Sequence, residues 1–330
     1  MNAVDTGSAR EYLEGGAGTV PADNEQQWRR YAIYPRPLAG VSSVDLSMDI
    51  FGHRIDLPVL AAASAAHGLW HPDGEVETAR GVRAAGSILA LSHGSTRSPA
   101  QVAPHSGPYL QQLYLPQERD VALPFITEVT GLGAIGLILT IDQIPVPFEQ
   151  PFRLAGQAGA VVPHWQAYPP GTLPASSFSA ADITWLTGHS ELPVIVKGVM
   201  HPDDARAAID AGAGAIVVSN HGGRQFPGAA TPAEVLSSVA AAVNGRVPVY
   251  VDSGIRGADD VVRALCLGAD AVFLGRPIVR ALAAGGASAV TTLLTELRDQ
   301  VASLLALAGV GNLADCGPGM LLARSAGGVQ

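Results

Sequence analysis

Cysteine, aromatic residues and long apolar runs are scarce in this 330-residue sequence. The two cysteines, Cys266 and Cys316, lack the spacing of a metal site, so we expect reduced thiols and no metal. No apolar run approaches the roughly 18 residues of a membrane span. The first residues, Met-Asn-Ala-Val-Asp, form neither the basic start nor the apolar core of a signal peptide. We therefore expect a cytoplasmic protein without a membrane span.

An excess of basic residues is also missing. The 29 acidic residues outnumber the 20 basic ones, and the net charge of -9 argues against nucleic acid as a partner. Only 15% of the residues are charged, whereas 48% are hydrophobic. This composition is typical of a compact enzyme with many buried strands, and we expect its partners to be small molecules.

What the sequence does contain is a series of short apolar runs that end in small, turn-forming or polar residues. Such runs are typical of parallel strands buried on both faces. Eight of them occur, at 59–65, 88–92, 108–115, 134–142, 194–200, 215–221, 249–255 and 271–277.

Alanine-rich amphipathic segments of helical length separate most of these runs. Examples are 75–85, 203–211, 232–243 and 258–267. Four joins carry a glycine that fits the left-handed residue ending a helix, namely Gly86, Gly133, Gly212 and Gly268. Eight strand–helix units predict an α/β fold of the (β/α)8 TIM-barrel class. An open, doubly wound sheet is less favoured, because no Gly-x-Gly-x-x-Gly motif follows the first run.

Two segments fall outside the repeat. Residues 1–57 are predicted to form an N-terminal arm or lid, packed on a single barrel domain of residues 58–330. Residues 143–180 are rich in proline and glycine and lack helical periodicity. Because structureless loops of this length are usually functional or disordered, we predict a substrate-side loop.

Polar residues at the ends of the runs indicate the position of a site. The carboxyl ends of barrel strands meet at one face, where active sites lie, and polar groups in apolar strands are costly unless paired. Six runs end in such residues: Gln112 and Tyr114, Thr140 and Asp142, Lys197, His221, Asp252 and Arg256, and Arg276.

His221 and Arg224 follow the sixth run, three residues apart. A histidine exchanges a proton near neutral pH, and a guanidinium binds a carboxylate through two parallel hydrogen bonds. An isolated histidine at a strand end more often caps a turn. The polar strand ends around this one favour a base and an anion clamp.

Gly254, Arg256, Gly275 and Arg276 follow the seventh and eighth runs. Loops at these two positions of a barrel frequently bind phosphate through backbone amides and a cation. Turn glycines beside surface arginines are the simpler interpretation, yet both pairs fall at the favoured positions. Lys197 needs an anionic neighbour, and a ring that gains negative charge on reduction would provide one.

These residues also carry a family resemblance. The segment Ser219-Asn-His-Gly-Gly-Arg-Gln225 resembles the active-site signature of the FMN-dependent α-hydroxy acid oxidases and dehydrogenases. The similarity runs from Glu11 to about Ala314. Further motifs in the family's order are His71-Pro-Asp-Gly-Glu75, Gln112-Leu-Tyr114, Leu139-Thr-Ile-Asp142, Val196-Lys-Gly198, Asp252-Ser-Gly-Ile-Arg256 and Gly275-Arg-Pro277.

The resemblance implies a homotetramer that uses FMN to oxidise a 2-hydroxy acid, or a related alcohol, to the 2-oxo product. It makes His221 the base and Asp142 the group that supports its charged form. It places Tyr114 on the reacting oxygen, and Arg224 and Tyr12 on the substrate carboxylate. The cofactor-binding residues that it implies are Ser64, Ala65, Ser92, Gln112, Thr140, Lys197, Ser219, Asp252, Gly254, Arg256, Gly275 and Arg276.

The sequence departs from the family's pattern at several places. Glu149 stands where the family normally has an arginine, and a glutamate there would repel a carboxylate substrate, although Arg153 is near enough to compensate. His93 stands where relatives have a second serine, and it either fills space in the packing or enters the pocket. Ser253 replaces a glycine, and the first strand ends in the small residues of 63–66. The departures predict an altered, enlarged pocket.

Three hypotheses therefore stay open. The first is oxidation of a 2-hydroxy acid, or of a larger biosynthetic intermediate or amine. The second is a non-oxidative flavin isomerase, and the third is a flavin-binding protein without turnover.

Overall fold

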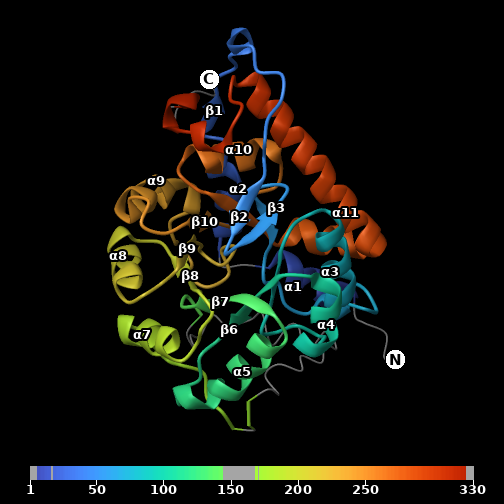
Figure 1. Cartoon of the computed structure of the whole chain (residues 1–330), viewed down its shortest axis with the longest axis vertical. Coiled ribbons are helices and arrows are strands. Elements are labelled where there is room, and N and C mark those ends of the chain that lie inside the picture. Colours follow the sequence, from blue (N-terminus) through green and yellow to red (C-terminus); the bar gives the residue numbers. More distant parts are fainter. Residues whose placement is uncertain (1–5, 16–17, 144–167, 170, 325–330) are drawn as a thin grey trace.

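The computed structural model describes residues 6–15, 18–143, 168–169 and 171–324, and its centre is a closed barrel of parallel strands (Figure 1). The strands pair in chain order, and the last closes onto the first, with Val272 opposite Val59. This confirms the predicted (β/α)8 barrel. Each strand lies within one predicted run: β4 (Val59–Ala61), β5 (Leu89–Leu91), β6 (Tyr109–Leu113), β7 (Ala134–Thr140), β8 (Val194–Val199), β9 (Ala215–Val218), β10 (Val249–Val251) and β11 (Ala271–Leu274).

Helices surround the barrel on its outside (Figure 1). They are α3 (Glu75–Ala84), α4 (Pro99–Ser106), α5 (Leu123–Gly131), α7 (Ala180–Gly188), α8 (Pro202–Asp210), α9 (Pro232–Val243), α10 (Ala258–Cys266) and α11 (Arg276–Leu307). Local chemistry sets their ends: Thr231 and Glu234 form a capping box at the start of α9. The four predicted helix-ending glycines all have positive φ, between +70° and +105°.

The core has two layers. Inside the barrel, alternate strand residues such as Leu60, Ile138 and Ile195 pack against one another, whereas their neighbours face the helices. A hairpin of β2 (Met48–Ile50) and β3 (His53–Ile55) adds Ile50 and Ile55 to the inner layer. The amino-terminal end of the barrel is therefore filled, and the carboxyl end is available for a site.

The N-terminal arm contains two helices, α1 (Thr6–Glu14) and α2 (Val20–Trp28), and a strand, β1 (Tyr31–Ile33). β1 pairs antiparallel with β12 (Leu321–Ala323), so segments near both ends of the chain lie together. Trp28 is fully buried, and its indole nitrogen donates to the carbonyl of Ser253 at 3.0 Å. The arm therefore reaches the loop after β10. Short 3-10 turns occur at Pro37–Ala39, His67–Leu69, Arg119–Ala122, Leu313–Asp315 and Pro318–Met320.

Helix α11 is the one described helix whose length and composition would allow it to cross a membrane. It bends at Gly285 and Gly286, which have non-helical backbone angles, and it packs against α3 and α10. Its exposed positions include Arg280, Thr292 and Glu296. The polar outer face and the packed inner face are typical of a helix that covers a barrel.

Candidate active site

A pocket lies where the carboxyl ends of the barrel strands meet the N-terminal arm. Residues of the arm and of the strand ends line it together. Thirteen of the predicted site residues are in this lining: Tyr12, Ser64, Ala65, Ser92, Tyr114, Lys197, His221, Arg224, Asp252, Gly254, Arg256, Gly275 and Arg276. The structure thus brings together residues that are up to 264 positions apart in the chain, from Tyr12 to Arg276.

Four other predicted residues stand outside the lining and support it. Gln112 accepts hydrogen bonds from Ser92 and from the backbone of His93, and it donates to Thr140 at 3.1 Å. The hydroxyl of Ser219 accepts from Lys197 at 2.9 Å. These buried groups fix the orientation of side chains that do face the pocket. Asp142, the fourth, supports His221.

The side chains of His221 and Asp142 form the central pair of the site. Nδ1 of His221 lies 2.9 Å from Oδ1 of Asp142. His221 adopts a left-handed backbone conformation, with φ of 58°, and its backbone N–H donates to Ser219. Because Asp142 accepts at Nδ1, the neutral imidazole carries its proton there and keeps the lone pair on Nε2. This tautomer is the one a base requires.

Asp142 is held as an anion. Burial raises the pKa of its carboxyl group, but the charges of His221 and Lys197 outweigh burial and bring the pKa below its ordinary value. Oδ2 of Asp142 is buried without a hydrogen-bond partner among the described residues. The carboxylate is therefore available to stabilise a positive charge on His221.

Gly198 makes room for Asp142. Its φ is +108°, and a Cβ at this position would lie 2.8 Å from both Cβ and Cγ of Asp142. The register of β8 against β9 shifts between Lys197 and Val199, on either side of this glycine. A glycine is required here for both backbone and space.

Lys197 provides a fixed positive charge in the pocket wall. Its Nζ lies 3.5 Å from Oδ2 of Asp252. Burial lowers the pKa of Lys197, but the charges of Asp252 and Asp142 raise it by more. The pKa of Lys197 therefore lies above its ordinary value. The side chain thus stays an ammonium group, which could stabilise negative charge on a group bound in the pocket.

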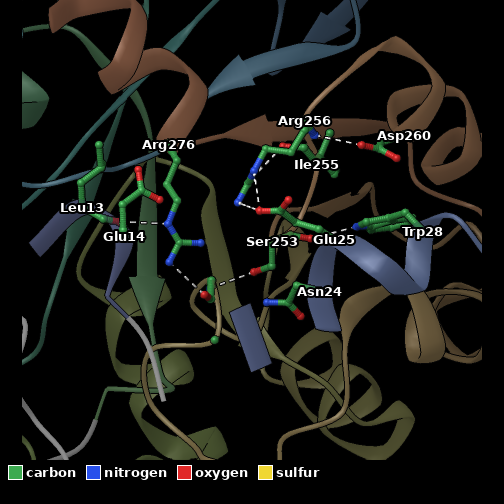
Figure 2. Close-up of polar contacts among 12 residues, drawn as sticks. Leu13, Glu14, Asn24, Glu25, Trp28, Ser253, Ile255, Arg256, Asp260 and Arg276 are labelled. Carbon is green, nitrogen blue, oxygen red and sulfur yellow. Dashed lines mark hydrogen bonds and ion pairs between the residues drawn. The ribbon is translucent and has the colours of Figure 1, made fainter. Parts of the chain in front are cut away.

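Arg224 and Arg276 both bind the carbonyl end of α1. Arg224 donates to the carbonyls of Tyr12 at 2.8 Å and Gly15 at 3.2 Å, and its guanidinium lies 5.0 Å from the centre of the Tyr12 ring. Arg276 donates to the carbonyl of Leu13 at 3.0 Å (Figure 2). It also donates to the carbonyl of Gly15, again at 3.0 Å. The negative end of the α1 dipole thus faces two cations.

A third cation, Arg256, lies on the same side of the pocket. Burial, then the charges of Arg224 and Arg256, lower the pKa of Arg276 to about 10. Three arginines whose charges repel one another make a site that an anion stabilises. A phosphate group therefore fits this end of the pocket, and the ammonium group of Lys197 fits a ring that gains negative charge on reduction.

Ser253 connects the loops after β9 and β10. With a positive φ of 73°, it accepts a hydrogen bond from the backbone of Gly222 at 2.9 Å and donates to Asp252 at 2.7 Å. A glycine would adopt this backbone more easily but could make neither bond. The departure from the family's glycine thus has a structural role.

His93 does not line the pocket. It is completely buried, and its ring lies 5.9 Å from that of Tyr114, 5.1 Å from that of Phe125 and 5.0 Å from that of Tyr168. Of the two possibilities for His93, packing is the one that the structure supports. The hydroxyl of Tyr168 donates to the carbonyl of Tyr114 at 2.8 Å.

Sequence reasoning missed Trp70 and Gln143, which also line the pocket. Each adjoins a predicted motif: Trp70 precedes His71, and Gln143 follows Asp142. Glu149 and Arg153 lie outside the described residues. Among the residues that the structure does describe, no group of three His, Cys, Asp or Glu side chains could hold a metal ion.

Comparison with known proteins identifies the family. The model of the FMN-dependent dehydrogenases matches residues 3–323. The chain belongs to this family. It is therefore an oxidoreductase with FMN as its cofactor, as the resemblance implied.

Several relatives match over most of their length. L-lactate oxidase of Lentilactobacillus hilgardii is 36% identical over 327 residues, which cover 91% of this chain and 88% of the relative. 4-Hydroxymandelate oxidase of Amycolatopsis orientalis is 36% identical over 327 residues, which cover 92% of this chain and 90% of the relative. Glycolate oxidase 1 of Oryza sativa is also 36% identical, with coverage of 89% and 85%.

Solved structures agree with this family. A lactate oxidase of Pediococcus acidilactici has a TM-score of 0.90 at 33% identity and covers 98% of this chain and 92% of its own. A mandelate oxidase with benzoyl-formic acid has a TM-score of 0.86 at 35% identity, with coverage of 97% and 94%. The fold of this chain, including its N-terminal segment, is thus similar to that of known oxidases.

Proposed function

We propose that the chain oxidises a 2-hydroxy acid to the 2-oxo acid, with His221 as the base and Arg224 as the carboxylate clamp. The observation that carries this proposal is the His221–Asp142 pair, 2.9 Å apart, at a pocket that Arg224 also lines. Relatives named for lactate, glycolate and hydroxymandelate, all of them 2-hydroxy acids, support the substrate class.

When bound, FMN supplies the acceptor for the two electrons of the substrate. Lys197 would stabilise the ring's developing charge. The remaining proposed ring-side residues are Ser64, Ala65, Ser92, Gln112, Thr140 and Ser219, and the proposed phosphate-side residues are Asp252, Gly254, Arg256, Gly275 and Arg276.

The proton is handled by the protein's own groups. Nε2 of His221 takes the proton that the substrate loses, and Asp142 stabilises the imidazolium that results. Tyr114 donates to the reacting oxygen, and its ring is held by the buried aromatic cluster around His93. Tyr12 is a neutral phenol at this site, because burial raises its pKa despite the nearby Arg224. It can therefore donate to a substrate carboxylate.

A larger intermediate, or a related alcohol or amine, is the second candidate class of substrate. It is supported by the small residues Ala62, Ala63 and Ala65, which contribute little side-chain volume where they line the pocket. We also propose a cytoplasmic homotetramer, by resemblance to the family. Cys266 and Cys316 are both free thiols, in keeping with a reducing compartment.

Anaerobic titration of the purified holoprotein tests the function. Glycolate, lactate, mandelate and larger 2-hydroxy acids are added in turn, and the oxidised flavin absorbance is followed. Bleaching by one of them, with one equivalent of 2-oxo acid per flavin, is the expected result. Product formation without net flavin reduction would instead indicate an isomerase, and a flavin that no member of the series reduces would contradict the proposal.

A further inference from the structure

Glu25 on α2 lies against Arg256, one of the proposed phosphate-binding residues. Its Oε1 accepts from Nε of Arg256 at 2.9 Å and lies 2.8 Å from Nη2 (Figure 2). Nη1 of Arg256 donates to the carbonyl of Ile255 at 2.9 Å. The Nε–Nη2 edge of a guanidinium is one that binds phosphate oxygens through two parallel bonds. In this chain a carboxylate occupies that edge.

The position of Glu25 is fixed by its neighbours on α2. Asn24 exchanges hydrogen bonds with Asn220 at 2.9 and 2.7 Å, and Trp28 donates to Ser253. The carbonyl of Asn24 also lies directly against Gly254, where a Cβ could not fit. Because α2 is anchored on both sides of Glu25, the carboxylate can leave Arg256 by rotation of its own side chain, without release of the arm.

The charge of Glu25 acts on a cluster of three arginines, Arg224, Arg256 and Arg276. Burial lowers the pKa of Arg276 most, and the charges of Arg224 and Arg256 lower it further. The charges of Glu14 and Glu25 raise it. Glu14 is also bound to Arg280, with Oε2 2.7 Å from Nη2. Among the residues that the structure describes, Glu25 is therefore the one carboxylate that forms an ion pair with Arg224, Arg256 or Arg276.

We propose that Glu25 is an internal counter-ion that competes with the phosphate of FMN for Arg256, so that the N-terminal arm limits the affinity for the cofactor. This inference rests on the proposed phosphate site. A phosphate dianion near Arg256 must either share the guanidinium with Glu25 or displace it, and the two anions repel each other. Riboflavin, which lacks the phosphate, should be insensitive to Glu25.

The test is the binding of FMN and of riboflavin to the apoprotein, measured by the change in flavin fluorescence. Glu25→Gln removes the charge and keeps the shape. We expect a roughly threefold to tenfold lower Kd for FMN at low salt. The gain in affinity should shrink in 0.5 M NaCl, because salt screens the repulsion between Glu25 and the phosphate. The Debye length falls from about 8 Å at 0.15 M salt to about 3 Å at 1 M. The Kd for riboflavin should stay unchanged.

Two variants serve as controls. Glu25→Asp keeps the charge and should bind FMN much as the wild type does. Glu296→Gln removes the same charge from the exposed face of α11 and should leave both Kd values unchanged. An unchanged or higher Kd of Glu25→Gln for FMN would overturn the inference, as would an equal gain for riboflavin.

Arg256→Gln separates this inference from the site on which it rests. If Arg256→Gln weakens FMN but not riboflavin, the phosphate site stands, and the Glu25→Gln result decides the role of Glu25 alone. If Arg256→Gln leaves the Kd for FMN unchanged, the phosphate site itself is wrong, and the competition proposed for Glu25 is overturned with it.

Discussion

Nδ1 of His221 lies 2.9 Å from Oδ1 of Asp142, although the two residues are 79 positions apart in the chain. One comes from the loop after β9 and the other from the end of β7. The contact fixes which imidazole nitrogen is free for the pocket. It therefore links the topology of the barrel to the chemistry proposed for it.

Asp142→Asn tests this relationship. An amide can accept at Nδ1 but cannot stabilise the charged imidazolium, so the rate of flavin reduction by substrate should fall about 100-fold to 10,000-fold. FMN content, from the ratio of visible to ultraviolet absorbance, should match that of the wild type. A reduction rate within threefold of the wild type would contradict the role of Asp142.

Gly198→Ala tests the same pair from the other side. The new Cβ would lie 2.8 Å from two atoms of Asp142, so the carboxylate must move away from His221. We expect a loss of flavin reduction of about the same size as in Asp142→Asn, and a lower Tm from the strained backbone at φ +108°. Gly212→Ala provides a control with a similar φ of +103° on the outer side of the barrel, before β9. It should lower the Tm but leave the reduction rate unchanged.

Arg224→Lys tests the carboxylate clamp. A lysine keeps the charge but loses the paired hydrogen bonds of a guanidinium. With a loss of about 1.5–3 kcal/mol, KM for the hydroxy acid should rise roughly 10-fold to 150-fold. The matching 2-hydroxy amide has no carboxylate and should show little change between the two proteins. Equal effects on acid and amide would mean that Arg224 acts by holding α1 rather than the substrate.

Acid stability should depend on Asp142. Its pKa in the folded chain is below its ordinary value, so the group stabilises the fold above the pKa of the unfolded chain, about 3.9. That contribution is lost as the pH falls through the lower, folded pKa. Between pH 6 and pH 3, the Tm of the wild type should therefore fall more steeply than that of Asp142→Asn. Parallel curves would show that the shift is too small to matter.

Much of the barrel and its site could be predicted from the sequence because buried parallel strands leave a direct signal. Apolar runs ending in polar residues located β6 to β11, and with them Lys197, His221 and Arg256. The polar ends also predicted that these side chains lie close together, and all three line one pocket.

The arm was harder to predict. Residues 11–30 are polar and interrupted by glycine, so they lack the periodicity that predicts a helix. Helices α1 and α2 are stabilised by contacts with distant loops, such as Trp28 with Ser253. The pairing of Glu25 with Arg256 spans 231 positions and leaves no local trace. His93 was ambiguous for a similar reason, because the rings around it come from three separate segments.

The role of His221 as the base of a flavin-dependent oxidation can be measured in a single turnover. Anaerobic stopped-flow mixing of the wild type and of His221→Asn with the best 2-hydroxy acid gives the rate of flavin reduction in a single turnover. We expect His221→Asn to retain FMN and to be reduced at least about 100-fold more slowly. A variant that binds FMN and is reduced as fast as the wild type would contradict it.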